Sequence, residues 1–188
     1  MAIRTALLIV GIATLAYGRS NKYTHYYWRD YTGEIPCDAV IGAFNDSGTT
    51  IYIGQGWAMY NEAFSLAPVP IVEGERVQKT VISGVPVDVV PLKILCVTSP
   101  YPDKWIETNT SGLVAVAEKN QLIPGGIEFH TDPAYNGYNF NLTIGRAQVG
   151  GKPKIGKIVS YFGMSVLYLV DGDRIVEALN FEVLAANN

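Results

Sequence analysis

The feature that most restricts the fold is an internal repeat. Residues 51–56, IYIGQG, reappear as residues 142–147, LTIGRA. Three further motifs recur in the same order around them: a Trp, an Ile-Pro pair and an alternating closing segment (Trp28, Ile35-Pro36 and 92–96 in the first copy; Trp105, Ile123-Pro124 and 181–185 in the second). Repeated units usually pack on each other, because one copy cannot bury its apolar face alone. The sequence therefore predicts two homologous units sharing one core.

The units themselves are predicted to be built of short strands. β-branched runs bounded by Gly, Pro or Ser indicate strands, and the chain has 19 Gly and 10 Pro to supply turns. We expect an all-β fold, with two tandem antiparallel units related by a pseudo-twofold axis. Only residues 114–121, inside an insertion in the second unit, indicate a short helical turn. The predicted strands are 51–53, 79–82, 85–90, 92–97, 142–144, 165–170 and 178–184.

The predicted boundaries begin with a leader. Residues 1–18 combine Arg4, an apolar run of about ten residues and small residues at a cleavage site, as secretory signal peptides do. The run is shorter than the roughly 20 residues that a membrane span needs. We expect a secreted protein without membrane insertion, whose first unit is residues 19–98 and whose second is residues 105–188, joined by residues 99–104.

Secretion gives the two cysteines a meaning. An oxidising compartment favours pairing, so the sequence predicts a disulfide between Cys37 and Cys96. Three Asn-x-Ser/Thr tripeptides are candidate glycosylation sites, at Asn45, Asn109 and Asn141. Because such tripeptides are common by chance, they add little to the argument for secretion.

The composition argues against several classes of function. Lys and Arg number 14 against 17 Asp and Glu, giving a net charge of -3, whereas nucleic-acid binding needs clustered cations. Two histidines, with two cysteines that are expected to be bridged to each other, cannot build a closed four-ligand zinc site. His130 lies two residues before Asp132, but no nucleophile motif accompanies them, so we expect a locally hydrogen-bonded loop histidine, and His25 falls in an aromatic stretch. We expect neither enzyme nor cofactor.

The second unit contains a spaced series of motifs: Trp105, Ile123-Pro124, Ile144-Gly145-Arg146-Ala147, Ile155-Gly156-Lys157, Gly163 and Phe181-Glu182-Val183-Leu184. This series resembles the DM-nine repeat family of small invertebrate proteins. The first unit matches at Trp28, Gly33-Glu34-Ile35-Pro36, Ala39-Val40, Ile53-Gly54 and 92–95, so the resemblance covers both units. It implies antiparallel sheets and recognition of mannose-type glycans or microbial surfaces.

The resemblance also implies which residues would touch a sugar. A lysine in the Gly-Lys motif and an Asp after the Ile-Pro strand correspond to Lys157 and Asp132. In the first unit the alignment places Pro68 opposite Lys157, and Asn45 with Asp46 at the Asp position. The first site is therefore predicted to be degenerate, and a chain with one site would need to form homo-oligomers to agglutinate cells.

One alternative belongs to another class. The repeat would survive as the scaffold of a secreted structural or protein-interaction protein in which the sugar site has decayed. The aromatic stretch at Tyr23, Tyr26, Tyr27, Trp28 and Tyr31 would then be a protein contact surface, since Tyr and Trp dominate interface hot spots. Glycan binding separates the two hypotheses.

Overall fold

The protein has the all-β fold that the sequence predicts. A computed structural model describes residues 25–98, 104–130 and 139–186. Its elements are β1 Tyr26–Asp30, β2 Ile41–Phe44, β3 Thr50–Tyr60, β4 Ala63–Val72, β5 Gln78–Ile82, β6 Val85–Val89, β7 Lys93–Val97, β8 Lys104–Asn109, α1 Leu113–Lys119, β9 Pro124–His130, β10 Asn139–Val149, β11 Lys152–Tyr161, β12 Met164–Asp171, β13 Arg174–Ala178 and β14 Asn180–Ala185.

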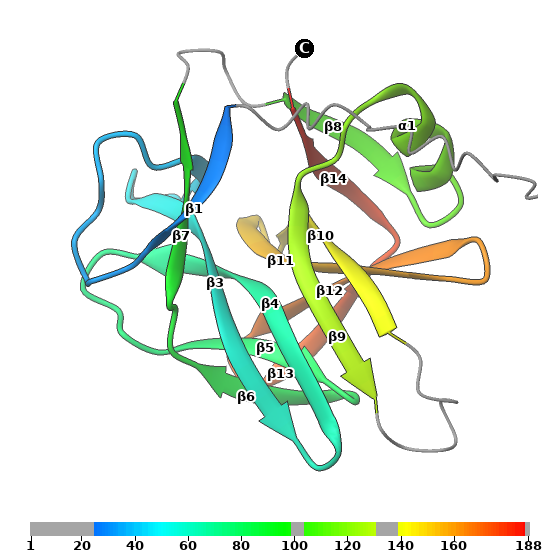
Figure 1. Cartoon of the computed structure of the whole chain (residues 1–188), viewed down its shortest axis with the longest axis horizontal. Helices are drawn as coiled ribbons and strands as arrows, with labels where there is room; N and C mark the ends of the chain where they lie inside the picture. Colours follow the sequence, from blue (N-terminus) through cyan, green and yellow to red (C-terminus); the bar gives the residue numbers. More distant parts are fainter. Residues whose placement is uncertain (1–24, 99–103, 131–138, 187–188) are drawn as a thin grey trace, which may run out of the picture.

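Twelve of the described strands form one antiparallel sheet, and β5 pairs only with β6 (Figure 1). The main path runs β1-β7-β3-β4-β9-β10-β11-β12-β13, with β2 beside β3 and with β14 pairing both β10 and β8. The β4–β9 pairing joins the two parts of the chain directly, from Ala63 opposite His130 to Leu66 opposite Ile127. The sheet is therefore continuous across the boundary between the predicted units.

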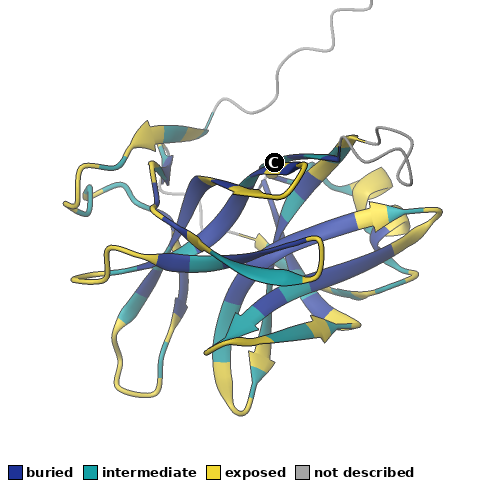
Figure 2. Ribbon diagram, turned by 90° about the horizontal axis from the view of Figure 1, so that it is seen from below, coloured by how far each residue is buried: buried dark blue, intermediate teal, exposed yellow. Residues whose placement is uncertain are grey.

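The largest buried cluster draws on both parts of the chain. Ile53 and Leu95 pack in it with Ile144 and Leu184, and Trp28 and Trp105 cover it. Figure 2 shows that the buried residues gather where the strands cross, while the hairpin turns are exposed. The two parts thus share a core. Their origin by duplication stays a prediction.

One backbone hydrogen bond of the first part has a counterpart in the second part. The Val40 amide donates to the Leu95 carbonyl at 2.9 Å, and the Ile123 amide donates to the Leu184 carbonyl at 3.0 Å. Val40 directly precedes β2, and Ile123 directly precedes β9. Each bond ties this residue to the last strand of its part of the chain, β7 or β14. By this hydrogen-bond pattern the counterpart of Ile123 is Val40, whereas the sequence alignment assigns Ile35 to it.

Each predicted strand overlaps an observed one, and one strand that prediction missed, β4, has an identifiable reason. The predicted strand 178–184 is broken at Leu179 into β13 and β14, and the predicted helical turn is α1. β4 was missed because it contains Pro68 and Pro70, which cannot donate to a ladder. Both prolines lie beyond Leu66, the last β4 residue that pairs with β9, so at these positions β4 has β3 as its paired neighbour.

The predicted disulfide is wrong. Both cysteines are free thiols, Cys37 exposed and Cys96 buried. Cys96 is fully buried against Ile71 and Ile94, and this burial raises the pKa of its thiol to about 11. The residue facing Cys96 across the neighbouring segment is Ala39, so Cys37 lies two positions away from the place where a bridge could form.

Parts of the predicted organisation lie outside the described residues. These parts are the signal peptide, residues 1–18, and residues 99–103 of the joint. No helix within 25–98, 104–130 or 139–186 combines the length and apolar character needed to cross a membrane.

Candidate functional site

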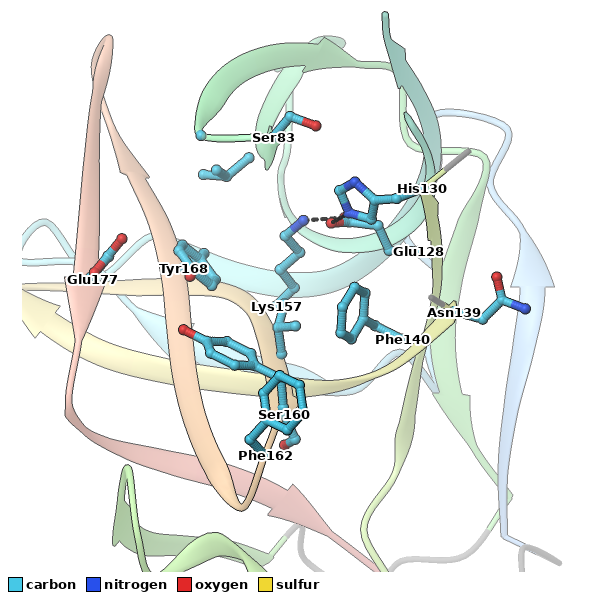
Figure 3. A pocket seen from close by; sticks show the side chains of 14 residues that line it. Ser83, Glu128, His130, Asn139, Phe140, Lys157, Ser160, Phe162, Tyr168 and Glu177 are labelled. Atoms are coloured by element: carbon cyan, nitrogen blue, oxygen red, sulfur yellow. Dashed lines mark hydrogen bonds and ion pairs between the residues drawn. The ribbon is translucent and has the colours of Figure 1, made fainter. Parts of the chain in front are cut away.

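The main pocket of the described residues, of about 790 Å³, lies where the β5–β6 hairpin meets β9, β11 and β12. This volume is within the roughly 300–1,000 Å³ typical of small-molecule sites. Val81 and Ser83 line it from the first part of the chain, and Glu128, Lys157 and Tyr168 from the second (Figure 3). Residues from both predicted units therefore build its walls.

A buried ion pair with a histidine beside it lies on the wall of this pocket. Lys157 on β11 is 2% exposed, and its ammonium group donates to the Glu128 carboxylate of β9. The second carboxylate oxygen of Glu128 lies 3.0 Å from Nε2 of His130. Glu128 and His130 are both buried, and alternate residues of one strand point to the same face, which brings both toward Lys157.

Burial governs the charge of this cluster. It lowers the pKa of Lys157, because removal from water disfavours the ammonium form, while the Glu128 carboxylate opposes that shift. Removing one partner of a buried ion pair typically costs about 3–5 kcal/mol, since the other charge is left uncompensated. Loss of either Lys157 or Glu128 would therefore leave the other buried without its partner.

Aromatic side chains enclose the lysine. In Figure 3 the Lys157 stem runs between Phe140 and Tyr168 toward Glu128 and His130. Phe140 meets the His130 ring edge-on, with centroids 5.7 Å apart. Burial raises the pKa of Tyr168, so its hydroxyl stays protonated at neutral pH. The pocket thus combines a cation, a carboxylate, a hydroxyl and apolar ring faces.

The structure brings only part of the predicted site together. Lys157 is in the pocket, whereas Asp132 lies outside the described residues. Asn45 folds its own loop: its side-chain oxygen accepts from the amides of Ser47, at 3.1 Å, and Thr49, at 2.8 Å. Asp46 is exposed beside it.

The three candidate glycosylation sites differ in their surroundings. Asn109 is exposed at the end of β8, and its side-chain oxygen accepts from the Gly112 amide ahead of α1 at 2.9 Å. Asn141 is exposed on β10, whereas Asn45 is half-buried. Attachment of glycans at any of the three stays a prediction.

The counterpart of Lys157 in the first part of the chain is Pro70 and not Pro68. Lys157 lies opposite Ile144 in the β10–β11 hairpin, and Pro70 lies opposite Ile53 in the β3–β4 hairpin. Both isoleucines precede a glycine in the repeated motif. The alignment without gaps places Gly74 opposite Gly163, and it is two residues off here because Pro70 lies four residues before Gly74 whereas Lys157 lies six residues before Gly163.

The same registers show what stands in place of Glu128. Phe44 lies opposite Thr50, and Ile127 lies opposite Asn141, and each partner is three residues ahead of the repeated isoleucine. Asn45 and Glu128 directly follow Phe44 and Ile127, so Asn45 is the counterpart of Glu128. The first part of the chain therefore has an amide and a proline where the second has a carboxylate and an ammonium group.

Sequence reasoning missed Glu128 and misplaced His130. Glu128 is absent from the predicted site because the resemblance points to Asp132, and His130, expected in a loop, ends strand β9. The signal that could have found them is their spacing in Ile127-Glu128-Phe129-His130, which places the acid and the imidazole on one strand face. This spacing predicts a functional site only weakly, and it becomes informative when a buried cation is known to lie opposite.

The Lys157–Glu128 pair has the donors and acceptors needed to form hydrogen bonds with a polyhydroxyl ligand. An ammonium group has three donors, and within the described residues that of Lys157 donates to Glu128 alone. In the same described ranges no three His, Cys, Asp or Glu side chains are grouped as a metal ion would need.

Comparisons with known proteins add no family assignment. No protein-family model matches the chain, and no curated protein matches it either.

Proposed function

We propose that the protein is a secreted, lectin-like protein that binds a mannose-type sugar in the pocket at Lys157. The observation that carries the proposal is the Lys157–Glu128 ion pair, which is buried among aromatic side chains on the wall of a pocket of about 790 Å³. Vicinal sugar hydroxyls can accept hydrogen bonds from an ammonium group and donate them to a carboxylate, and charge strengthens such bonds. The resemblance to DM-nine repeats points to the same lysine.

The walls of the pocket suit the rest of a pyranose. A sugar ring has an apolar side formed by its C–H bonds, which aromatic faces can cover. Phe140 and Tyr168 flank the Lys157 stem (Figure 3). The ligand would therefore place hydroxyls at the ion pair and ring carbons against these side chains. On this proposal each chain has one site, because Pro70 and Asn45 replace the two charged groups in the first part.

Calorimetric titration with methyl α-mannoside tests the proposal. The double variant Lys157→Met/Glu128→Gln removes both charges together and so avoids leaving one unpaired in the interior. We expect saturable binding to wild type and at least a tenfold loss in the double variant. Pro70→Ala, at the matched position of the first hairpin, should bind like wild type. Absence of heat with this sugar and with a glycan array would reject the lectin proposal.

A second candidate function rests on a different surface. Trp57, Met59 and Phe64 of the β3–β4 hairpin are 53%, 61% and 41% exposed. Trp57 and Met59 alternate on β3, and Phe64 lies opposite Met59, so the three share one face of the hairpin. An exposed apolar face of this kind suits a protein-interaction scaffold. Binding of a protein partner that survives the Lys157→Met/Glu128→Gln change but is lost in Trp57→Ser would favour the scaffold function.

A further inference from the structure

One side chain at the pocket rim is held in an unusual way. Phe162 is 88% exposed and lines the pocket. It occupies the two-residue turn between β11 and β12 with a φ of 49°, followed by Gly163 with a φ of 80°. A bulky residue at positive φ is a conformational outlier, and it stores strain in the backbone. Glycine or asparagine would make the same turn without that strain.

A matching turn approaches the pocket from the first part of the chain. Ser83 and Gly84 connect β5 to β6 with φ values of 49° and 73°, and both line the same pocket. Figure 3 shows Ser83 and Phe162 at opposite ends of the view, with Lys157 between them. One rim therefore offers a hydroxyl and the other an aromatic ring, and each is fixed by a tight turn.

The distance from the ion pair to this ring exceeds the reach of one sugar. Phe162 lies five residues beyond Lys157 along β11 and its turn. At about 3.3 Å per strand residue, this separation is roughly 16 Å between backbones. Val159 and Tyr161 line the pocket between the two positions. A single pyranose held at Lys157 cannot also cover Phe162, but a chain of linked sugars can.

We propose that Phe162 is the platform of a second sugar subsite, so that the ligand is the end of an oligosaccharide and not a lone monosaccharide. The inference rests on the proposed function and adds its ligand class. The terminal sugar occupies the ion pair at Lys157, and a following ring stacks on Phe162. On this proposal the strained turn is retained because it presents the ring at the pocket rim. A ring that packed against the protein surface would not be available to a sugar.

The test compares methyl α-mannoside with a linear α-mannotriose by calorimetry. Wild type should bind the triose more tightly than the monosaccharide, by roughly fivefold for one added aromatic contact. Phe162→Asn retains a residue that tolerates positive φ; it should remove this advantage and leave the affinity for methyl α-mannoside within twofold of wild type. Phe162→Trp keeps an aromatic ring at this position and should retain the tighter binding of the triose. Phe44→Asn changes an exposed phenylalanine outside the pocket and should affect neither ligand.

The outcomes separate the two proposals. Equal affinity of wild type for both sugars, or equal loss of both in Phe162→Asn with unchanged thermal stability, overturns the second subsite and leaves the lectin function standing. Binding of neither sugar overturns both. A melting temperature of Phe162→Asn at or above that of wild type checks that the change relieves strain and does not damage the fold.

Discussion

The β3–β4 and β10–β11 hairpins start from the same pairing and end with different chemistry. In each, an Ile-Gly pair lies opposite the returning strand: Ile53-Gly54 opposite residues 70 and 69, and Ile144-Gly145 opposite residues 157 and 156. From that point β10–β11 turns early and contributes Lys157 to the pocket. The β3–β4 hairpin runs further, contributes Pro70 at the matched position and exposes Trp57 and Met59. The two core isoleucines therefore keep the same place in both hairpins, while the residues paired with them, Pro70 and Lys157, differ in chemistry.

The largest expected difference between the hairpins is in the stability effect of the matched residues. Lys157→Ala leaves the Glu128 carboxylate buried without its cation, and we expect a loss of about 3–5 kcal/mol in the free energy of unfolding. Pro70→Ala should cost no more than about 1 kcal/mol, through the entropy of the unfolded chain. Urea denaturation measures both. Similar costs at the two positions would mean that the ion pair contributes nothing particular to the second hairpin.

A second difference concerns the side chains that reach across between the two parts. Arg146 donates to both carboxylate oxygens of Glu182, at 2.7 and 2.9 Å, and to the Gly42 carbonyl at 2.7 Å. Its guanidinium also lies 4.3 Å from the Trp105 ring centroid.

Gln55, at the matched position of the first part, donates only to the Gly125 carbonyl among the described residues, at 2.7 Å. We expect roughly 2–3 kcal/mol for Arg146→Ala and about 1 kcal/mol for Gln55→Ala in the free energy of unfolding. A double-mutant cycle with Glu182→Ala should show coupling for Arg146 and none for Gln55. Equal costs for the two alanine variants would contradict the comparison.

Replacing the glycine of the repeated Ile-Gly pair should change stability equally in the two hairpins, because both glycines lie in close contact with a neighbouring side chain. A Cβ at Gly54 would lie 2.6 Å from Ile71, and a Cβ at Gly145 would lie 2.7 Å from Ile158. Gly54→Ala and Gly145→Ala should each lower the free energy of unfolding by about 1–3 kcal/mol, since overpacking forces neighbours to shift. Thermal melts of the two variants should agree closely. A harmless substitution at one position only would show that the two cores are not equivalent.

The smallest expected effect is a dependence of stability on alkaline pH. The pKa of Lys157 is lower in the folded protein than the value of about 10.4 in an unfolded chain. Between those two values the unfolded chain binds more protons, so the free energy of unfolding rises with pH. Relative to Lys157→Met/Glu128→Gln, wild type should gain stability as the pH approaches 10.4. A flat difference would place the pKa of Lys157 at its ordinary value.

The sequence predicts the strand class well because it depends on local patterns. β-branched runs and Gly turns indicate strands without knowledge of the partners, and α1 follows from an insertion in the repeat. The site depends on partners that come from separate strands. Lys157 was found through a motif, but its neighbour Glu128 becomes visible only when β9 is placed against β10 and β11.

Errors of register explain the predictions that failed. The alignment gives Pro68 in place of Pro70 because it contains no gap between the hairpin and the following glycine, although this spacing is four residues in the first part and six in the second. The predicted Cys37–Cys96 bridge fails for a related reason, since the residues that face Cys96 are Tyr27 and Ala39. In a sheet a shift of one or two residues changes which side chains meet while the pattern of strands stays the same.

The position of the β5–β6 hairpin has a consequence for protein synthesis. Its residues form one wall of a pocket whose other walls come from β9 to β13, all of which follow the hairpin in the sequence. A ribosome that has made residues 25–98 has therefore produced one wall of the pocket and only part of the shared core. The pocket would be complete only after β13 has emerged, so a nascent chain could not bind the proposed ligand before that point.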